Sequence, residues 1–172
     1  MLKRSKLARK TPLRAKTALT TKTPLKNKNR GILEPQKAKR KSRTPLQKLK
    51  DKLWAECKRI IRARYQRYDG MWNCYTCGHL IELPAQCQTG HFIPSSICST
   101  ELRYDLDNLR PQCYRCNINL SGNWVAYEKH LKEEMGENFP EILKRRNDST
   151  KNFMYRADWY EMYLNNYRSI EK

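Results

Sequence analysis

Cys74-Tyr75-Thr76-Cys77 opens a stretch that continues through Gly90-His91-Phe92-Ile93 and Asp107-Asn108 to Gln112-Cys113-Tyr114-Arg115-Cys116-Asn117. It contains two Cys-x-x-Cys pairs with 35 residues between them. This spacing is typical of the two halves of a tetrahedral thiolate site, so the sequence predicts that Cys74, Cys77, Cys113 and Cys116 bind Zn²⁺. Four thiolates leave no open coordination position, and we therefore expect this zinc to be structural.

Three polar residues lie in and after this stretch in a fixed order: His91, Asn108 and Asn117, with 16 and then 8 residues between them. A strand–turn–helix unit with this order resembles the ββα-metal fold of HNH nucleases. The resemblance implies that His91 is the general base, that Asn108 orients it, and that Asn117 binds a catalytic Mg²⁺ or Mn²⁺ together with His91. Imidazole titrates near neutrality and can take a proton from water at cellular pH. A divalent cation would stabilise the charge on the phosphate.

Further motifs narrow the resemblance to one family. They are Gly90-His91-Phe92, Leu102-Arg103-Tyr104, Asp107-Asn108, Gln112 to Asn117, Leu120-Ser121-Gly122-Asn123, Tyr127 and His130-Leu131, and they span about residues 50–136. Together they are similar to the NinG/Rap family of bacteriophage recombination proteins. This resemblance implies a phage-encoded DNA endonuclease that cuts branched recombination intermediates such as Holliday junctions and D-loops.

Two positions depart from the usual HNH pattern. Gly90 stands where many HNH enzymes have an Asp or a His as a metal ligand, and Asn117 stands where a His is common. An asparagine offers a neutral oxygen ligand. Asp105 or Asp107 is an alternative source of a carboxylate for the metal.

The positive charge is concentrated at one end of the chain. The formal net charge is +19, of which residues 1–50 contribute +17 and residues 51–172 contribute +2. Such a block favours phosphate backbones through counterion release, so we expect DNA as the partner, with a localisation tag or solubilising tail as the alternative. The predicted DNA contacts are Lys39, Arg40, Lys41 and Arg43 in the basic block, and Arg103, Arg110 and Arg115 near the cysteine pairs.

The chain order predicts a mostly helical α+β protein. We expect a disordered basic tail over 1–44 with Thr-Pro-Leu repeats, and one domain over 45–172. Within the domain we expect a helix over 45–69 with Thr44 as its N-cap, a zinc-stapled ββα-metal core over 71–122, and C-terminal helices over 123–172. The first helix is expected to be amphipathic, with an apolar stripe that includes Leu53, Trp54 and Tyr68. Cys74 and Cys77 are expected on the turn of a short hairpin, and a strand is expected to end at His91. Residues 95–107 are expected to form a loop, an α-element to begin at Asn117, and a longer helix to follow Gly122 and stop at Gly136. Residues 148–150 are expected to cap the final helix, whose aromatic face should pack against the first helix.

Three functions remain open from the sequence. The first is the branched-DNA endonuclease, the second is a non-catalytic zinc-stabilised DNA-binding module, and the third is an HNH nicking enzyme of packaging or restriction. Catalysis predicts that His91 Nδ1 lies against a backbone carbonyl while Nε2 faces an open cleft beside Asn117. Burial of His91 away from Asn117 would favour the binding module. The sequence has no membrane-spanning run or secretory signal, so we expect a cytoplasmic protein, with a homodimer as an option for cutting four-way junctions.

Overall fold

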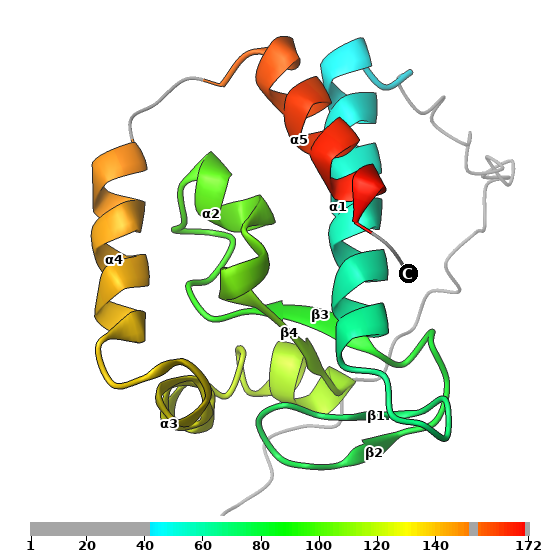
Figure 1. Ribbon diagram of the computed structural model, residues 1–172, viewed down its shortest axis with the longest axis vertical. Helices are drawn as coiled ribbons and strands as arrows, with labels where there is room; N and C mark the ends of the chain where they lie inside the picture. Colours follow the sequence, from blue (N-terminus) through cyan, green and yellow to red (C-terminus); the bar gives the residue numbers. More distant parts are fainter. Residues whose placement is uncertain (1–41, 152–154, 171–172) are drawn as a thin grey trace, which may run out of the picture. The chain divides into compact units, whose positions relative to one another are not determined.

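The protein is described by a computed structural model over residues 42–151 and 155–170 (Figure 1). The predicted tail over 1–44, with Lys39, Arg40 and Lys41, lies outside the described residues except for its last three. The elements in chain order are α1 (Pro45–Arg64), β1 (Trp72–Asn73), β2 (Leu80–Ile81), β3 (Gln88–His91), α2 (Thr100–Tyr104), β4 (Leu109–Gln112), α3 (Trp124–Met135), α4 (Phe139–Thr150) and α5 (Ala157–Ser169). The protein is therefore of the mixed α+β class.

The first helix begins where the sequence predicts. Thr44 is the N-cap, and its hydroxyl oxygen accepts a hydrogen bond from the Gln47 amide at 3.2 Å, while Pro45 occupies the first turn. The apolar stripe of α1 packs against α5, which runs beside it in Figure 1. The shared core contains Leu53, Cys57, Ile61, Tyr104, Leu109, Tyr160 and Leu164. The prediction that the C-terminal aromatic helix packs on the first helix is confirmed.

The predicted helix over 45–69 is too long, because α1 ends at Arg64. After it the chain reverses: Gln66 forms an antiparallel bridge with Trp72, and the Arg67 amide donates to the Met71 carbonyl at 2.9 Å. Tyr68 consequently projects into solvent with 98% of its surface exposed. The apolar spacing that suggested a longer helix includes a residue that contributes nothing to the core.

Two short antiparallel hairpins form the β structure. In the first, β1 pairs with β2, and the Cys74–Cys77 turn connects them as predicted. In the second, β3 pairs with β4 with His91 opposite Leu109 and Gly90 opposite Arg110. The predicted strand that ends at His91 is thus confirmed. All four residues of β4 are buried, so this strand is covered on both faces.

The segment between β3 and β4 and the segment after β4 both differ from the prediction. Residues 95–107 are not one loop, because Ser99 caps the short helix α2 with its side chain. After Cys113 the chain makes one π-helical turn, Arg115–Asn119, and then passes through left-handed conformations at Ser121 and Asn123 before α3 starts. The α-element expected from Asn117 onward is therefore only this short turn, which begins at Arg115, whereas the longer helix expected after Gly122 is present as α3. The HNH-like ββα core is not confirmed.

A second core holds the C-terminal half. Phe92, Leu102, Tyr127, Leu131 and Leu143 join β3, α2, α3 and α4. Gly136 ends α3 as predicted. Residues 148–150 do not cap the final helix, since they are the last residues of α4, and α5 begins at Ala157.

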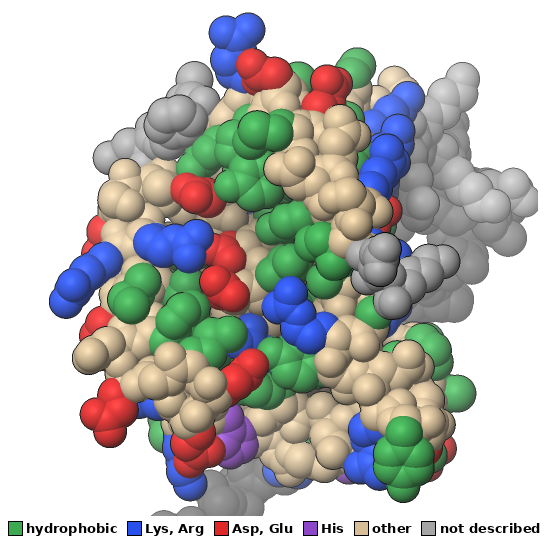
Figure 2. All heavy atoms as spheres, in the orientation of Figure 1, with side chains coloured by type: hydrophobic (Ala, Val, Ile, Leu, Met, Phe, Trp, Pro, Cys, Tyr) green, Lys and Arg blue, Asp and Glu red, His purple; other side chains and the backbone are tan. Residues whose placement is uncertain are grey.

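The surface in Figure 2 has basic and acidic side chains interspersed, which agrees with the small net charge of residues 51–172. None of the helices in the described ranges is long and apolar enough to cross a membrane.

Candidate metal site and histidine cleft

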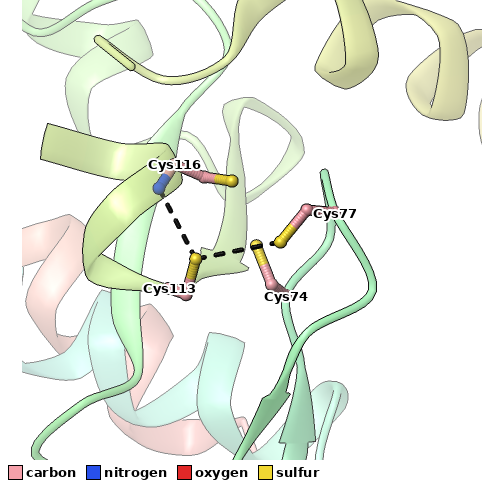
Figure 3. Close-up of side chains that lie close together, drawn as sticks. All are labelled: Cys74, Cys77, Cys113 and Cys116. Atoms are coloured by element: carbon pink, nitrogen blue, oxygen red, sulfur yellow. Dashed lines mark hydrogen bonds between the residues drawn. The ribbon is translucent and has the colours of Figure 1, made fainter. Parts of the chain in front are cut away.

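The four predicted zinc ligands come together from two separate segments. Cys74 and Cys77 lie on the β1–β2 turn, and Cys113 and Cys116 follow β4, with the four sulfur atoms directed toward one another (Figure 3). All four Sγ atoms lie within 4.8 Å of one another, and Cys77 Sγ is 3.9 Å from Cys113 Sγ. Sulfur ligands at zinc's usual bond length stand about 3.8 Å apart in a tetrahedron. The cluster is therefore close enough to hold a metal ion, and its spacing fits zinc.

The acid–base chemistry of these thiols also fits a cation. Burial alone would raise the pKa of Cys74, but hydrogen bonds from the Thr76 hydroxyl and from backbone amides lower it to about 6. Burial first, and the neighbouring thiols after it, raise the pKa of Cys77 to about 12 and also raise the pKa of Cys113. A thiolate at one position opposes ionisation of the next, and a bound cation removes that opposition.

The His91 ring makes two contacts, one with a backbone carbonyl and one with an aromatic ring. Its Nε2 lies 3.0 Å from the Arg103 carbonyl oxygen, and its ring stacks on Trp54 with centroids 5.2 Å apart and planes inclined by 9°. A carbonyl only accepts hydrogen bonds, so Nε2 carries the hydrogen and Nδ1 is the basic nitrogen. The expected contact with a backbone carbonyl is present, but Nε2 makes it instead of Nδ1. Nδ1 is therefore the nitrogen that can accept a proton.

The environment of the His91 ring favours its neutral form. Burial lowers the pKa of His91 to about 4; the hydrogen bond to the Arg103 carbonyl opposes this shift, and the positive charge of Arg103 adds to it. The unprotonated imidazole is the form that can accept a proton from water.

We expect this shift to be visible directly by NMR. At about pH 5.5 the His91 ring should still give the chemical shifts of neutral imidazole, since its pKa lies below the ordinary value near 6.5. Trp54→Ala exposes one face of the ring and should move the titration midpoint upward, toward the ordinary value. A wild-type ring that titrates at the same pH as the Trp54→Ala ring would contradict the burial argument.

Asn108 is fully buried and acts on the backbone rather than on the imidazole. Its Oδ1 accepts from the Ile93 amide at 2.8 Å, and its Nδ2 donates to the Leu102 carbonyl at 2.9 Å. These bonds fix the residue two positions after His91 and the residue directly before Arg103. Asn108 therefore positions both sides of the His91–Arg103 contact without touching the ring.

His91 and Asn117 line the same open cleft, whose volume is about 570 Å³. Arg103, Trp54, Thr89 and the segment Ser121–Gly122 complete its walls. The Thr89 hydroxyl is buried and has no hydrogen-bond partner among the described residues, so it is available to a bound molecule. No Asp or Glu of the described chain lines this cleft. Asp105 accepts from the Asp107 amide and pairs with Arg146, so neither aspartate supplies the alternative carboxylate there.

Gly90 is required by close packing with Gln112. A Cβ at position 90 would lie 1.9 Å from Gln112 Oε1, so a metal-binding side chain fits there only if the Gln112 side chain moves. Gln112 Nε2 donates to the Gly122 carbonyl at 2.7 Å and to Thr76 Oγ1 at 3.2 Å, and Thr76 Oγ1 is 3.4 Å from Cys74 Sγ. Gln112 thus links the cysteine site to the cleft wall.

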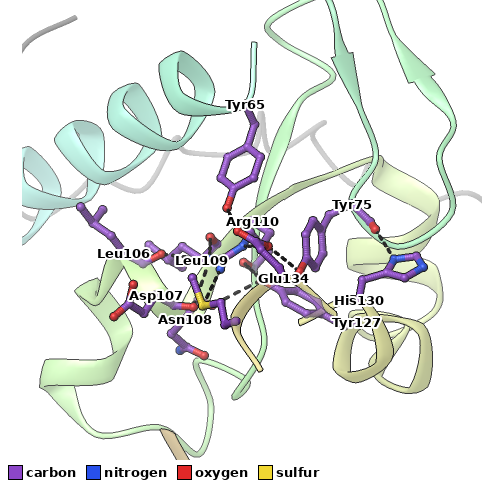
Figure 4. A network of polar contacts seen from close by, with 12 residues as sticks. Tyr65, Tyr75, Leu106, Asp107, Asn108, Leu109, Arg110, Tyr127, His130 and Glu134 are labelled. Carbon is purple, nitrogen blue, oxygen red and sulfur yellow. Dashed lines mark hydrogen bonds and ion pairs between the residues drawn. The ribbon is translucent and has the colours of Figure 1, made fainter. Parts of the chain in front are cut away.

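The predicted DNA contacts separate into accessible and inaccessible side chains. Arg103 and Arg115 are exposed, and Arg43 is exposed although it pairs with Asp51 at 2.6 Å. The prediction for Arg110 is wrong, because its side chain is completely buried, forms an ion pair with Glu134 at 3.0 Å and donates to three backbone carbonyls (Figure 4). A guanidinium in this position does not reach a phosphate.

Trp54 is the main residue of the cleft that the sequence analysis assigned elsewhere. It belongs to the apolar stripe of α1 and was expected in the core. Trp54 is adjacent in sequence to the buried Leu53 and therefore lies at the margin of the apolar stripe of α1. This marginal position was the only feature of the sequence that indicated that its ring could face a binding site.

These features define a mixed α+β protein with a four-cysteine site suited to a metal ion, next to an open cleft lined by a histidine and an asparagine. The chain belongs to the NinG family: the family model described as "Bacteriophage Lambda NinG protein" matches residues 3–172.

Curated relatives are similar over part of their length. "Protein ninG" of Salmonella phage P22 is 32% identical over 81 residues, and that of Escherichia phage 933W is 30% identical over 82 residues. "Protein ninG" of Escherichia phage lambda is 29% identical over 82 residues. These alignments cover 47–48% of this chain and 38–39% of the relatives. No solved structure matches the chain.

Proposed function

We propose that this protein is a metal-dependent DNA endonuclease that hydrolyses phosphodiester bonds in branched DNA, with His91 as the general base. The observation that supports it is that His91 and Asn117, far apart in the sequence, line one open cleft together with the exposed Arg103. Family membership adds the phage context. The branched substrate, such as a Holliday junction or a D-loop, rests on the resemblance set out above.

Each residue has a separate task in this proposal. Nδ1 of His91 has one lone pair, so it can accept a proton from water or bind a cation, but not both at once. As general base it leaves Asn117 Oδ1 as the protein ligand for Mg²⁺ or Mn²⁺, with water and phosphate oxygens filling the remaining positions. The cation would neutralise charge on the phosphate. Arg103 would pair with a neighbouring phosphate oxygen.

The absence of a carboxylate from the described cleft walls favours one alternative, a zinc-stabilised DNA-binding module without catalysis. In that case the His91–Arg103 contact and the Trp54 stack only stabilise the fold. A nicking enzyme of packaging or restriction would use the same cleft as the branched-DNA enzyme and differ in substrate.

A cleavage assay decides between these functions. Wild type and His91→Ala are incubated with a synthetic four-way junction or a matched linear duplex, in Mg²⁺ or Mn²⁺. We expect wild type to cut the junction preferentially and His91→Ala to be slower by about 10²- to 10⁴-fold, because general-base catalysis contributes this much. Zinc content and junction binding should stay the same.

His130→Gln is the matched control, since His130 lies on α3 with its Nδ1 2.6 Å from the Tyr75 carbonyl and does not line the cleft. It should retain cleavage. Tight binding by wild type without cutting in either metal would refute the nuclease proposal and leave the binding module. Equal cutting of both DNAs would favour the nicking enzyme.

A further inference from the structure

A second cavity lies on the other side of the turn that carries Asn117. Its volume is about 520 Å³, within the range of small-molecule sites. Leu80 and Ile81 of β2 give it an apolar wall, and His79, Gln88, Tyr114 and Arg115 give it aromatic and polar groups. The cysteine site forms one end of it, through Cys77 and Cys113. The proposed reaction does not use this cavity.

Tyr114 offers an open aromatic face there. It is 60% exposed, although it follows the buried Cys113 and precedes the exposed Arg115. Most tyrosines near the two hairpins are occupied differently: Tyr75 donates to Glu134, and Tyr127 is buried in the second core. Exposed aromatic rings beside a cationic side chain are how proteins hold unpaired nucleotides, with the base on the ring and the backbone on the cation.

The second cavity and the His91 cleft are neighbours that share lining elements. Gln88 lines both, and so does the Arg115–Asn119 turn, which places Arg115 in one and Asn117 in the other. Tyr114 immediately precedes this turn, so Tyr114 in one cavity and Asn117 in the other are three residues apart in the chain.

We propose that this cavity binds one unpaired DNA nucleotide next to the phosphate held in the His91 cleft, with its base stacked on Tyr114 and its phosphate paired with Arg115. This inference rests on the proposed function and deepens it. In the interior of a continuous duplex both faces of each base are covered by its neighbours, whereas a single-stranded branch supplies a free base face. The cavity thus gives a physical reason for preference for branched DNA.

The test separates binding from cleavage by using full-length His91→Ala protein with zinc and without Mg²⁺. The probe is a duplex with a single-stranded branch that carries 2-aminopurine at the first unpaired position, compared with the fully paired duplex. Tyr114→Ala in this background should weaken binding of the branched DNA about tenfold and abolish the quenching of 2-aminopurine, with little effect on the duplex. Tyr114→Trp should retain both properties.

Tyr68→Ala is the matched control, because Tyr68 is 98% exposed and lines neither cavity. It should leave both affinities unchanged. Arg115→Gln should weaken binding of the branched DNA more than binding of the paired duplex and should reduce the salt dependence of branched-DNA binding. Zinc content identifies any variant that fails to fold. If Tyr114→Ala is such a variant, Tyr114→Leu replaces it: leucine keeps the apolar bulk without an aromatic face and should also abolish the quenching.

Two outcomes would overturn the inference: unchanged preference for branched DNA in Tyr114→Ala and Tyr114→Leu, or an equal loss for the paired duplex. The result is independent of catalysis. If wild type never cuts DNA but Tyr114→Ala loses its preference for the branch, the nuclease proposal fails and the nucleotide site stands. If cutting depends on His91 while the preference survives Tyr114→Ala, the nucleotide site alone fails.

Discussion

Removal of a metal ion from the four-cysteine site is expected to unfold the β1–β2 hairpin and the segment that follows β4, while α1 stays packed on α5. The core around the site consists of Trp72, Ile81 and Cys87 with three of the four ligands, so little apolar surface remains to hold it once the metal is gone. The cores of α1–α5 and of α2–α4 contain none of the ligands. Structural zinc contributes on the order of 10 kcal/mol to folding of such sites.

Hydrogen exchange before and after chelation measures this effect. We expect amides in 72–81 and 113–119 to lose protection, and amides in α1 and α5 to keep it. Cys116→Ser should behave like the chelated protein and should bind no zinc, against about one ion per chain in wild type. Cys98→Ser is the control, because Cys98 lies outside the cluster and is only partly buried. A chelated protein with unchanged hairpin protection would show that the four thiols need no metal.

Loss of a metal ion from the four-cysteine site is also expected to disturb the cleft, because hydrogen bonds connect the two. The Asn117 amide donates to the Cys113 carbonyl at 3.0 Å, and Gln112 connects Thr76, beside Cys74, to Gly122 in the cleft wall. Chelation should therefore abolish cleavage even when Mg²⁺ is present in excess. This is a consequence of lost geometry, and it does not require zinc to take part in the reaction.

The sequence predicted what depends on local spacing and missed what depends on packing. Two Cys-x-x-Cys pairs define their site almost alone, because each pair forms a tight turn and the ligand type is unambiguous. The strand ending at His91 was also predictable. The orientation of its ring was not, since it depends on Trp54 from α1 and on the Arg103 carbonyl from α2, two elements that meet His91 only in the folded chain.

The 95–107 region shows a different reason for failure. Ser99 and Asn108 each make hydrogen bonds that turn a polar, irregular-looking stretch into ordered structure. Ser99 caps a helix of five residues, which is too short to show a periodic apolar pattern. The α-element expected at Asn117 is a π-helical turn that begins two residues earlier, and neither this turn nor the left-handed residues after it have a distinct sequence signal.

Arg110→Met is the second change for which a large effect is expected, and it tests whether Arg110 stabilises the fold instead of binding DNA. Arg110 is completely buried, with Tyr65 and Tyr75 rings 5.5 Å from its guanidinium carbon. Its loss leaves carbonyls of Leu106, Asp107 and Leu109 without this donor. Breaking a buried pair by removing one partner costs about 3–5 kcal/mol. The free energy of unfolding, measured with denaturant, should fall by about this amount.

Glu134→Gln should cost less, because the Glu134 side chain is 34% exposed and the amide can still accept a hydrogen bond from Arg110. The carboxylate also accepts from the Tyr65 and Tyr75 hydroxyls, and the amide has one oxygen for these three donors, so the loss of about one charge-assisted bond predicts about 1.5–3 kcal/mol. A double-mutant cycle then isolates the coupling between the two side chains. Glu134 continues the helical spacing of Tyr127 and Leu131, the buried residues of α3, at a position where an apolar residue is expected. An acidic residue at such a position was the sequence signal for a buried cation nearby.

Arg115→Met is the matched control, since Arg115 is exposed and five residues further along the chain. It should change the free energy of unfolding by no more than about 0.5 kcal/mol. The effects on DNA binding should have the opposite order to the effects on stability. At a temperature where every variant is folded, Arg115→Met should weaken DNA binding and Arg110→Met should not. Loss of DNA affinity in folded Arg110→Met, with stability unchanged, would mean that this guanidinium reaches the phosphate after all and that the buried network in Figure 4 opens on binding.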